Sequence, residues 1–268
     1  MENSIITQQL KVGYDGNIIV PCFDVELKKG RITSVIGANG CGKSTVLKAI
    51  GRIIKSEEGV VIINDRDMMK MRSSEIAKQM AILPQSPSAP GTLTCKELVS
   101  YGRFPYQKGL GKLTPEDKRI IEWALSVTNM SRFADREIAG LSGGQRQRAW
   151  IAMALAQQTG IILLDEPTTY LDLAHQLEVL ELLKKLNKEH NTTIVMVLHD
   201  LNLASKYSDY LLAMKDGRTE KYGTPREVMT EKTLRTCFGI DGSIATDERS
   251  GKPVCYSYEL AAKTDEQD

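Results

Sequence analysis

The sequence predicts an α/β fold whose layered core receives an inserted helical subdomain, and three observations support this prediction. Apolar runs typical of buried strands alternate with helical stretches, the pattern of a sheet covered by helices. A glycine-rich loop, GANGCGKST, lies between one such strand and the helix that follows it. The middle of the chain, by contrast, contains helical stretches without a convincing strand.

The strands of the core are expected to be short apolar runs bounded by turn residues and buried on both faces. The predicted helices between them include KSTVLKAIGRI, directly after the glycine-rich loop, and AHQLEVLELLKKLNKEH, whose leucines recur at near-helical spacing. In chain order the main predicted strands are RITSVIG (31–37), GVVIIND (59–65), MAILPQ (80–85), IILLDEP (161–167) and TTIVMVLHD (192–200).

The middle segment is predicted to be the helical insertion. A Pro- and Gly-rich stretch, SPSAPGTLT, leads into it. Thr114, Pro115, Glu116 and Asp117 then form a strong helix start. They supply a capping hydroxyl, a proline at the first helical position, and two acids at the positive end of the helix dipole.

The C-terminal part is predicted to contain hairpins. Asp216 and Gly217, in MKDGRTEKYG, are typical of a tight hairpin turn, and DERSGKPVCYSYE is consistent with a second hairpin. We therefore expect a single domain over residues 1–240 and a short C-terminal extension over 241–268. Within that domain the core covers about residues 1–85 and 159–240, and the helical subdomain covers about residues 86–158.

The composition excludes several classes of function. The chain has 35 Lys+Arg and 34 Asp+Glu, and a net charge of +1 gives no reason to expect nucleic acid as a partner. The start, MENSIITQQLKVGY, lacks the shape of a secretory signal, and no stretch approaches the ~18 consecutive apolar residues of a membrane span. Five scattered cysteines without a CxxC pair indicate reduced thiols. We expect a soluble, cytosolic protein that meets a membrane only through another protein.

The loop GANGCGKST fits the phosphate-binding pattern G-x-x-x-x-G-K-[ST]. Its glycines let successive backbone N–H groups converge on phosphate oxygens, and the helix that follows contributes its positive end. Lys43 is expected to reach the β and γ phosphates of ATP, and Ser44 to ligate Mg²⁺. Cys41 is expected to be a small filler, with a redox role as the alternative. The predicted binding loop is Gly37, Ala38, Asn39, Gly40, Cys41, Gly42, Lys43, Ser44 and Thr45.

The run IILLDEP is predicted to be a buried strand that delivers Asp165 and Glu166 to its C-terminal edge. Asp165 is suited to hold Mg²⁺, and Glu166 is suited to orient and polarise the water that attacks the γ-phosphate. A surface Asp-Glu pair is the alternative. Together with the glycine-rich loop, the pair predicts ATP hydrolysis.

The stretch LSGGQRQRAWIAMALA resembles the signature motif of ATP-binding cassette (ABC) ATPases, and it stands between GANGCGKST and IILLDEP in the order that this family uses. The resemblance covers about residues 5–240. It implies a P-loop ATPase core with an N-terminal antiparallel β subdomain. It also implies a head-to-tail homodimer, in which Ser142, Gly143, Gly144 and Gln145 of each copy close over the ATP held by the other. An ordinary helix N-terminus is the alternative.

Four further positions carry over from the family, and three of them have a named alternative. Tyr14 resembles the aromatic residue that stacks on adenine, or is a tyrosine on a hairpin face. Gln85 resembles the glutamine that reaches the metal and the attacking water, or is a loop residue. Asp172 resembles the loop aspartate that crosses the dimer interface. His199 resembles the switch histidine that contacts the γ-phosphate, rather than a histidine of the core.

The resemblance also indicates which kind of ABC protein this is. A single free-standing cassette is similar to those of bacterial importers, whose integral membrane permease subunits and extracytoplasmic binding protein it would serve from the cytoplasmic face. YGRFPYQ and LLDEPTTYLDLAHQLEVLELL are most similar to ATPases for iron-siderophore uptake. Haem or cobalamin uptake and a soluble non-transport ATPase remain alternatives. Arg103, Pro105 and Tyr106 either line the groove for the permease or only pack a helix.

Overall fold

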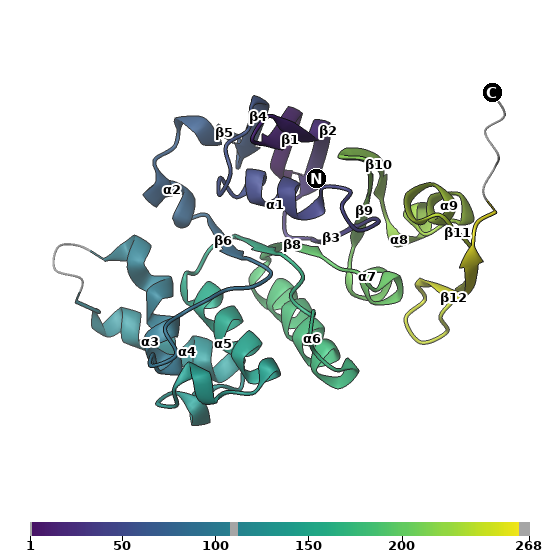
Figure 1. Ribbon diagram of the computed structural model, residues 1–268. Coiled ribbons are helices and arrows are strands. Elements are labelled where there is room, and N and C mark those ends of the chain that lie inside the picture. Colours follow the sequence, from purple (N-terminus) through teal and green to yellow (C-terminus); the bar gives the residue numbers. More distant parts are fainter. Residues whose placement is uncertain (1, 108–111, 263–268) are drawn as a thin grey trace. The chain divides into compact units, whose positions relative to one another are not determined.

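The structure, a computed structural model, describes residues 2–107 and 112–262 (Figure 1). The chain groups into two compact units. The first comprises Met1–Ile5, Lys28–Arg31 and Ile62–Met196, and the second comprises Ile6–Leu27, Ile32–Val61 and Val197–Asp268. The last six residues of the predicted C-terminal extension, 263–268, lie outside the described residues.

The first unit contains a parallel sheet in the order β8-β7-β6, formed by β6 (Met80–Leu83), β7 (Ile161–Leu164) and β8 (Thr193–Val197). Leu164 of β7 lies opposite Leu83 of β6 and Met196 of β8. Every residue of β7 is buried, as the continuous apolar run IILL predicts for a strand covered on both faces. Because the strands are parallel, the residues that follow β6 and β7 emerge at the same edge.

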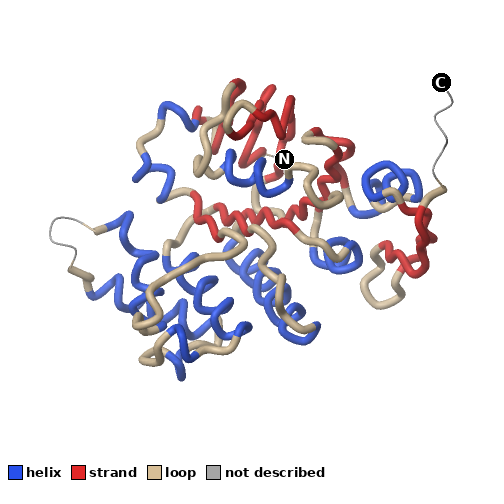
Figure 2. Tube along the Cα trace, viewed as in Figure 1, coloured by secondary structure: helices blue, strands red, loops and turns tan. Residues whose placement is uncertain are grey.

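Helices and loops make up the described residues between β6 and β7, which confirms the prediction of a middle segment without strands (Figure 2). The helices α3, α4 and α5 pack on one another. Thr114 begins α4 as predicted: its Oγ1 accepts a hydrogen bond from Asp117 N at 3.1 Å, and Asp117 Oδ2 accepts one from Thr114 N at 2.9 Å. The helical elements are α3 (Cys95–Ser100), η2 (Tyr101–Tyr106), α4 (Pro115–Val127), η3 (Ser131–Phe133), η4 (Ile138–Gly140) and α5 (Gly143–Ala156).

The longest helix of the first unit is α6 (Leu173–His190). The expected leucine stripe is largely confirmed, because Leu180, Leu183 and Leu186 are buried. Leu177 is only half-buried, and Val179 takes part in the buried face instead. The remaining elements of this unit are β5 (Arg66–Asp67), η1 (Met68–Lys70) and α2 (Ser73–Ala77).

The described residues of the second unit include three β-hairpins, and two of them, β9–β10 and β11–β12, are predicted from the sequence. β1 and β2 are neighbours joined by the two-residue turn Asp15–Gly16, so they form an antiparallel hairpin beside β4. β9 lies between β3, to which it is parallel, and β10, to which it is antiparallel. Asp216 and Gly217 join β9 to β10 with φ of 47° and 71°, the left-handed values of a type I′ turn.

The C-terminal hairpin of β11 and β12 is also present, and it packs against α7 and α9. Outside the hairpin, α8 packs against β9 and β10. The elements of this unit are β1 (Asn3–Tyr14), β2 (Asn17–Lys28), β3 (Ile32–Ile36), α1 (Lys43–Ile50), β4 (Glu58–Ile63), α7 (Leu201–Tyr207), β9 (Tyr210–Lys215), β10 (Arg218–Gly223), α8 (Pro225–Val228), α9 (Glu231–Phe238), β11 (Ile240–Thr246) and β12 (Pro253–Leu260).

Candidate active site

The glycine-rich loop connects β3 to α1 in the second unit, and its backbone requires glycine at three positions. Gly40 and Gly42 have φ of 80° and 98°, a conformation that residues with a side chain rarely adopt. At Gly37 a Cβ would lie 2.5 Å from the carbonyl oxygen of Met214 on β9. The loop can therefore keep this tight path only without side chains at these points.

Lys43 is the first residue of α1, and its ammonium group turns back over the loop. Its Nζ donates to the carbonyl oxygens of Gly37 and Ala38, each at 2.9 Å, and the residue is only 6% exposed. The free backbone N–H groups and the dipole of a helix N-terminus favour an anion at this place. With the hydroxyls of Ser44 and Thr45, they form a set of donors that fits the phosphate groups of a nucleotide.

Cys41 is buried within the loop and acts as a filler. Burial raises the pKa of its thiol, which keeps the thiol protonated. A Cβ at Gly37 would lie 2.7 Å from Cys41 Sγ, so the sulfur occupies the space beside that glycine. The loop is also held from outside, because the backbone N–H of Gly217, in the β9–β10 turn, donates to Cys41 O at 3.0 Å.

Two carboxylates follow β7 in the first unit, where the sequence predicts them. Asp165 is 3% exposed, and its backbone N–H donates to Leu83 O on β6 at 2.9 Å. Glu166 has a φ of 53°, in the left-handed region that residues other than glycine seldom occupy. Backbone strain of this kind is concentrated at functional sites, where the surrounding structure holds it in place.

The side chain of Glu166 is held by two donors. Gln85 Nε2 donates to Glu166 Oε2 at 2.6 Å, and Thr169 Oγ1 donates to the same oxygen at 2.9 Å. Gln85 reaches Glu166 because β6 and β7 are parallel and end at one edge. Both bonds hold the carboxylate at the end of β7, beside Asp165. Sequence reasoning missed Thr169, for which the second threonine of DEPTT was the only signal.

The motif LSGGQ begins α5, and its serine caps the helix. Ser142 Oγ accepts from the backbone N–H of Gln145 at 3.3 Å, while Gln145 Oε1 accepts from the N–H of Ser142 at 3.1 Å. Ser142 and Gly143 are exposed, and a Cβ at Gly143 would meet nothing within 4 Å. The helix start therefore presents a hydroxyl and backbone donors to its surroundings, and the motif contains no lysine.

Gly144 is buried for a local reason that the sequence did not reveal. A Cβ there would lie 2.8 Å from Cδ2 of His175, on α6, so only glycine leaves room for the imidazole. His175 Nδ1 lies 2.7 Å from Asp172 Oδ1, and the backbone N–H of His175 donates to the same oxygen at 2.9 Å. These two bonds, the backbone one first, lower the pKa of Asp172 and keep it ionised near neutral pH. Because an ionised carboxylate only accepts, the imidazole Nδ1 is the donor.

The predicted site residues thus fall into two groups. The first unit joins Gln85 to Glu166, and joins Gly144 to Asp172 through His175. The second unit holds the glycine-rich loop, Tyr14 and His199. Tyr14 ends β1 and is 41% exposed, so its ring is available for stacking. His199 is exposed in the segment between β8 and α7 and is therefore not a histidine of the core.

Arg103 is buried, which decides whether it lines a groove for the permease or only packs a helix. It is 4% exposed, and its Nε donates to Asp117 Oδ1 at 2.8 Å. Its Nη1 donates to Ala156 O at 2.8 Å, and its guanidinium lies 4.0 Å from the ring centroid of Tyr106. Arg103 therefore packs η2 against α4 and α5 and does not line a groove for a partner.

Over residues 2–107 and 112–262, no group of three or more His, Cys, Asp or Glu side chains is arranged to hold a metal ion. Mg²⁺ at phosphate-transfer sites needs only one or two protein ligands, because the substrate supplies others. Over the same residues, no helix is both long and apolar enough to cross a membrane.

Comparison with known proteins identifies the family. The sequence profile of the ABC transporter family matches residues 22–169. The iron(3+)-hydroxamate import ATP-binding protein FhuC of Bacillus subtilis (strain 168) is 57% identical over 258 residues, which cover 96% of this chain and 96% of that protein.

Two solved structures have the same fold. An inward-facing ABC transporter, assigned to the metal-chelate type, contains a chain that is 29% identical, with a TM-score of 0.82 over 98% of this chain and 99% of that chain. A dimeric ATP-binding cassette in a post-hydrolysis state with ADP and Pi is 31% identical, with a TM-score of 0.71 over 82% of this chain and 98% of that chain. The chain therefore belongs to the ABC transporter family and carries its ATP-binding, ATP-hydrolysing cassette.

Proposed function

We propose that the protein is the ATP-hydrolysing subunit of a bacterial importer that takes up an iron-siderophore complex. The observation that carries this proposal is the 57% identity, over nearly the full length of both chains, to an import ATP-binding protein for iron(3+)-hydroxamate. The likeness to a transporter assigned to the metal-chelate type supports the same class of substrate. In this proposal the subunit works at the cytoplasmic face of the membrane, and an extracytoplasmic binding protein delivers the chelate to the permease.

In this proposal, different residues bind ATP, hold Mg²⁺ and orient the attacking water. Lys43 and the N–H groups of its loop bind the β and γ phosphates of ATP, and the exposed ring of Tyr14 stacks on the adenine. Glu166 orients the attacking water, and Gln85 holds the carboxylate of Glu166 in place. Mg²⁺, with Ser44, Gln85 and Asp165 as its protein ligands, would neutralise charge on the phosphates. His199 contacts the γ-phosphate.

The signature motif of each copy acts on the ATP of the other in this proposal. The hydroxyl of Ser142 and the N–H groups that begin α5 are suited to a terminal phosphate. They bring no lysine, which suits a phosphate already held by Lys43 of another chain. The likeness to a dimeric cassette bound to ADP and Pi supports a homodimer. Asp172, near the signature motif, would cross the interface.

The permease is proposed to dock on an exposed aromatic pair of the helical segment. Tyr101 and Phe104, on η2, are 38% and 57% exposed, and their rings stack with centroids 4.8 Å apart. Exposed aromatic side chains of this kind are enriched among the residues that dominate protein interfaces. The pair replaces Arg103, which is buried, as the expected contact in YGRFPYQ.

Changing both Tyr101 and Phe104 to serine is expected to weaken binding to the detergent-solubilised permease by at least about tenfold, because two interface anchors are lost. The control is the double change of Tyr256 and Tyr258 on β12, which are 68% and 69% exposed, to serine. The affinity of each double variant is measured by its binding to permease that is immobilised on a surface. Equal affinities of the two double variants would show that η2 is not the docking surface.

The substrate class is tested by deleting the gene in the bacterium and growing the strain on single iron sources. We expect loss of growth on one or more ferric siderophores, restored by the wild-type gene but not by a Lys43→Ala gene. Haem as the iron source, and cobalamin-dependent growth, serve as controls that should be unaffected. Growth defects confined to haem or cobalamin would overturn the siderophore assignment but leave the transport ATPase in place.

A further inference from the structure

His175 occupies a position between two functional segments of the first unit. On one side, Cδ2, Cγ and Nε2 of its ring lie 2.8, 3.2 and 3.4 Å from the place that a Cβ of Gly144 would take. On the other side, Nδ1 is hydrogen-bonded to Asp172 Oδ1 at 2.7 Å. Gly144 belongs to the motif proposed to bind the partner's ATP. Asp172 precedes α6 and, as its N-cap, fixes where that helix begins.

The segment before Asp172 leads back to Glu166 through its own hydrogen bonds. The backbone N–H of Thr169 donates to Glu166 O at 3.3 Å, in addition to the bond from its hydroxyl to the carboxylate. Leu171 N donates to Thr168 O at 3.3 Å, and Gln176 Nε2 donates to Leu171 O at 2.8 Å. These hydrogen bonds hold the short loop between Glu166 and Asp172 at several points. A displacement of Asp172 would therefore also displace Glu166.

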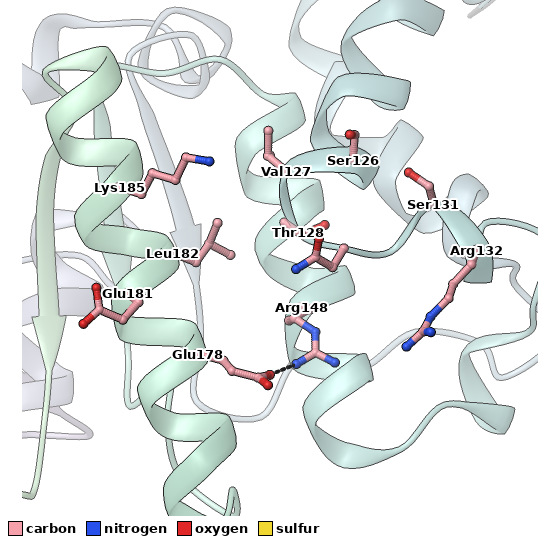
Figure 3. A pocket seen from close by; sticks show the side chains of 11 residues that line it. Ser126, Val127, Thr128, Ser131, Arg132, Arg148, Glu178, Glu181, Leu182 and Lys185 are labelled. Atoms are coloured by element: carbon pink, nitrogen blue, oxygen red, sulfur yellow. Dashed lines mark hydrogen bonds and ion pairs between the residues drawn. The ribbon is translucent and has the colours of Figure 1, made fainter.

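A second contact between α5 and α6 lies one turn further along both helices. Arg148 Nη1 donates to Glu178 Oε2 at 2.5 Å (Figure 3). That pair also lines an open cavity of about 1050 Å³, whose wall includes Leu182 and Lys185 of α6, residues 126–129, Ser131 and Arg132. The start of α5 and the start of α6 thus meet at His175, one turn before this ion pair.

We propose that His175 is a positioning residue that joins the signature motif to Asp172, so that binding of the partner's ATP at Ser142 and Gly144 is linked to the placement of this chain's own Glu166. Both halves of the imidazole are needed. The ring edge supports Gly144 and thereby sets where α5 begins, and Nδ1 fixes the ring to Asp172. This inference rests on the proposed head-to-tail dimer and adds to it a physical connection between the two ATP sites.

The test separates the two halves of the side chain. His175→Asn keeps a donor near the position of Nδ1 but removes the ring edge from Gly144. His175→Phe keeps a ring of similar size but removes the hydrogen bond to Asp172. The matched control is His190→Phe, at the other end of α6, where the imidazole makes an edge contact with Trp123 at a centroid distance of 5.6 Å. All three are made in the full-length Glu166→Gln protein, which should retain bound ATP.

Two quantities are measured for each variant: the affinity of the monomer for ATP, and the ATP concentration at which half the protein sediments as a dimer. We expect both His175 variants to need on the order of tenfold more ATP to dimerise, because each dimer contains two such links. ATP affinity of the monomer and the thermal unfolding midpoint should stay at the values of the Glu166→Gln parent. A loss of packing alone would instead lower the unfolding midpoint.

Parent-like dimerisation of either His175 variant would overturn the inference, since it would show that one half of the imidazole is dispensable. An equal shift in the His190→Phe control would also overturn it, because the effect would then not be specific to the signature end of α6. Failure of the Glu166→Gln parent itself to dimerise with ATP, in solution or on the permease, would refute the proposed head-to-tail site and the inference with it.

Discussion

Replacing Glu166 with glutamine is expected to lower the rate of ATP hydrolysis by about two to four orders of magnitude, the usual contribution of a positioned general base. The substitution keeps the shape of the side chain and an oxygen that can accept from Gln85 Nε2 and Thr169 Oγ1, which lie 2.6 and 2.9 Å from Oε2. It removes the charge and the basicity that polarise water. The loop should therefore keep its path while the chemical step fails.

The measurement is release of inorganic phosphate at saturating ATP, with ATP binding followed separately. A matched control is Glu122→Gln, an exposed glutamate on α4, which should hydrolyse ATP at the wild-type rate. We expect Glu166→Gln to bind ATP with unchanged or higher affinity and to remain in an ATP-filled dimer. Phosphate release by this variant at the rate of the control would remove Glu166 from the chemical step.

Much of the site follows from the sequence because its parts are local. The path of the glycine-rich loop depends on Gly37, Gly40 and Gly42, and these lie within a few residues of Lys43. The position of Asp165 and Glu166 follows from the buried strand IILL, which ends where the charges begin. The parallel pairing of β6 with β7 brings Gln85 to the same edge. Such strand-end placements are predictable when strand order can be inferred.

The contacts that the sequence did not predict are those that depend on how one helix meets another. His175 has an ordinary helical setting in LDLAHQ, and only the approach of α5 places its ring on Gly144. Thr169 belongs to a polar loop, and nothing in DEPTT distinguishes a hydroxyl that bonds Glu166 from one that faces solvent. Arg103 is a charged residue, a type that is seldom buried unless it is paired. The sequence predicts its partner Asp117 only as an acid at the positive end of a helix dipole.

Changing Arg103 to leucine is expected to destabilise the protein by about 3–5 kcal/mol, the cost of removing one member of a buried ion pair. Asp117, 5% exposed, would keep its hydrogen bonds from Thr114 but lose the guanidinium, and Ala156 O would lose a donor. In a protein of this size such a loss lowers the midpoint of thermal unfolding by roughly 10 °C. The control is Arg119→Leu, whose partner Glu116 is exposed on the same helix and which should change stability by less than about 0.5 kcal/mol.

The pH dependence of the unfolding free energy is a second test of the ion pair between Arg103 and Asp117. Burial is the largest single influence on the pKa of Asp117, and it raises that pKa. The hydrogen bonds from Thr114 and Arg103 together outweigh burial, so the pKa of Asp117 is lowered. A carboxyl group with a lowered pKa in the folded state stabilises fully above its unfolded pKa of about 3.9, and this stability is lost as the pH falls through the lower folded value. The destabilisation by Arg103→Leu should therefore be complete at pH 7 and shrink below about pH 4, because protonated Asp117 no longer needs the guanidinium. A difference in unfolding free energy between wild type and variant that stays constant from pH 7 to pH 3 would show that lost packing, and not the ion pair, is the cause.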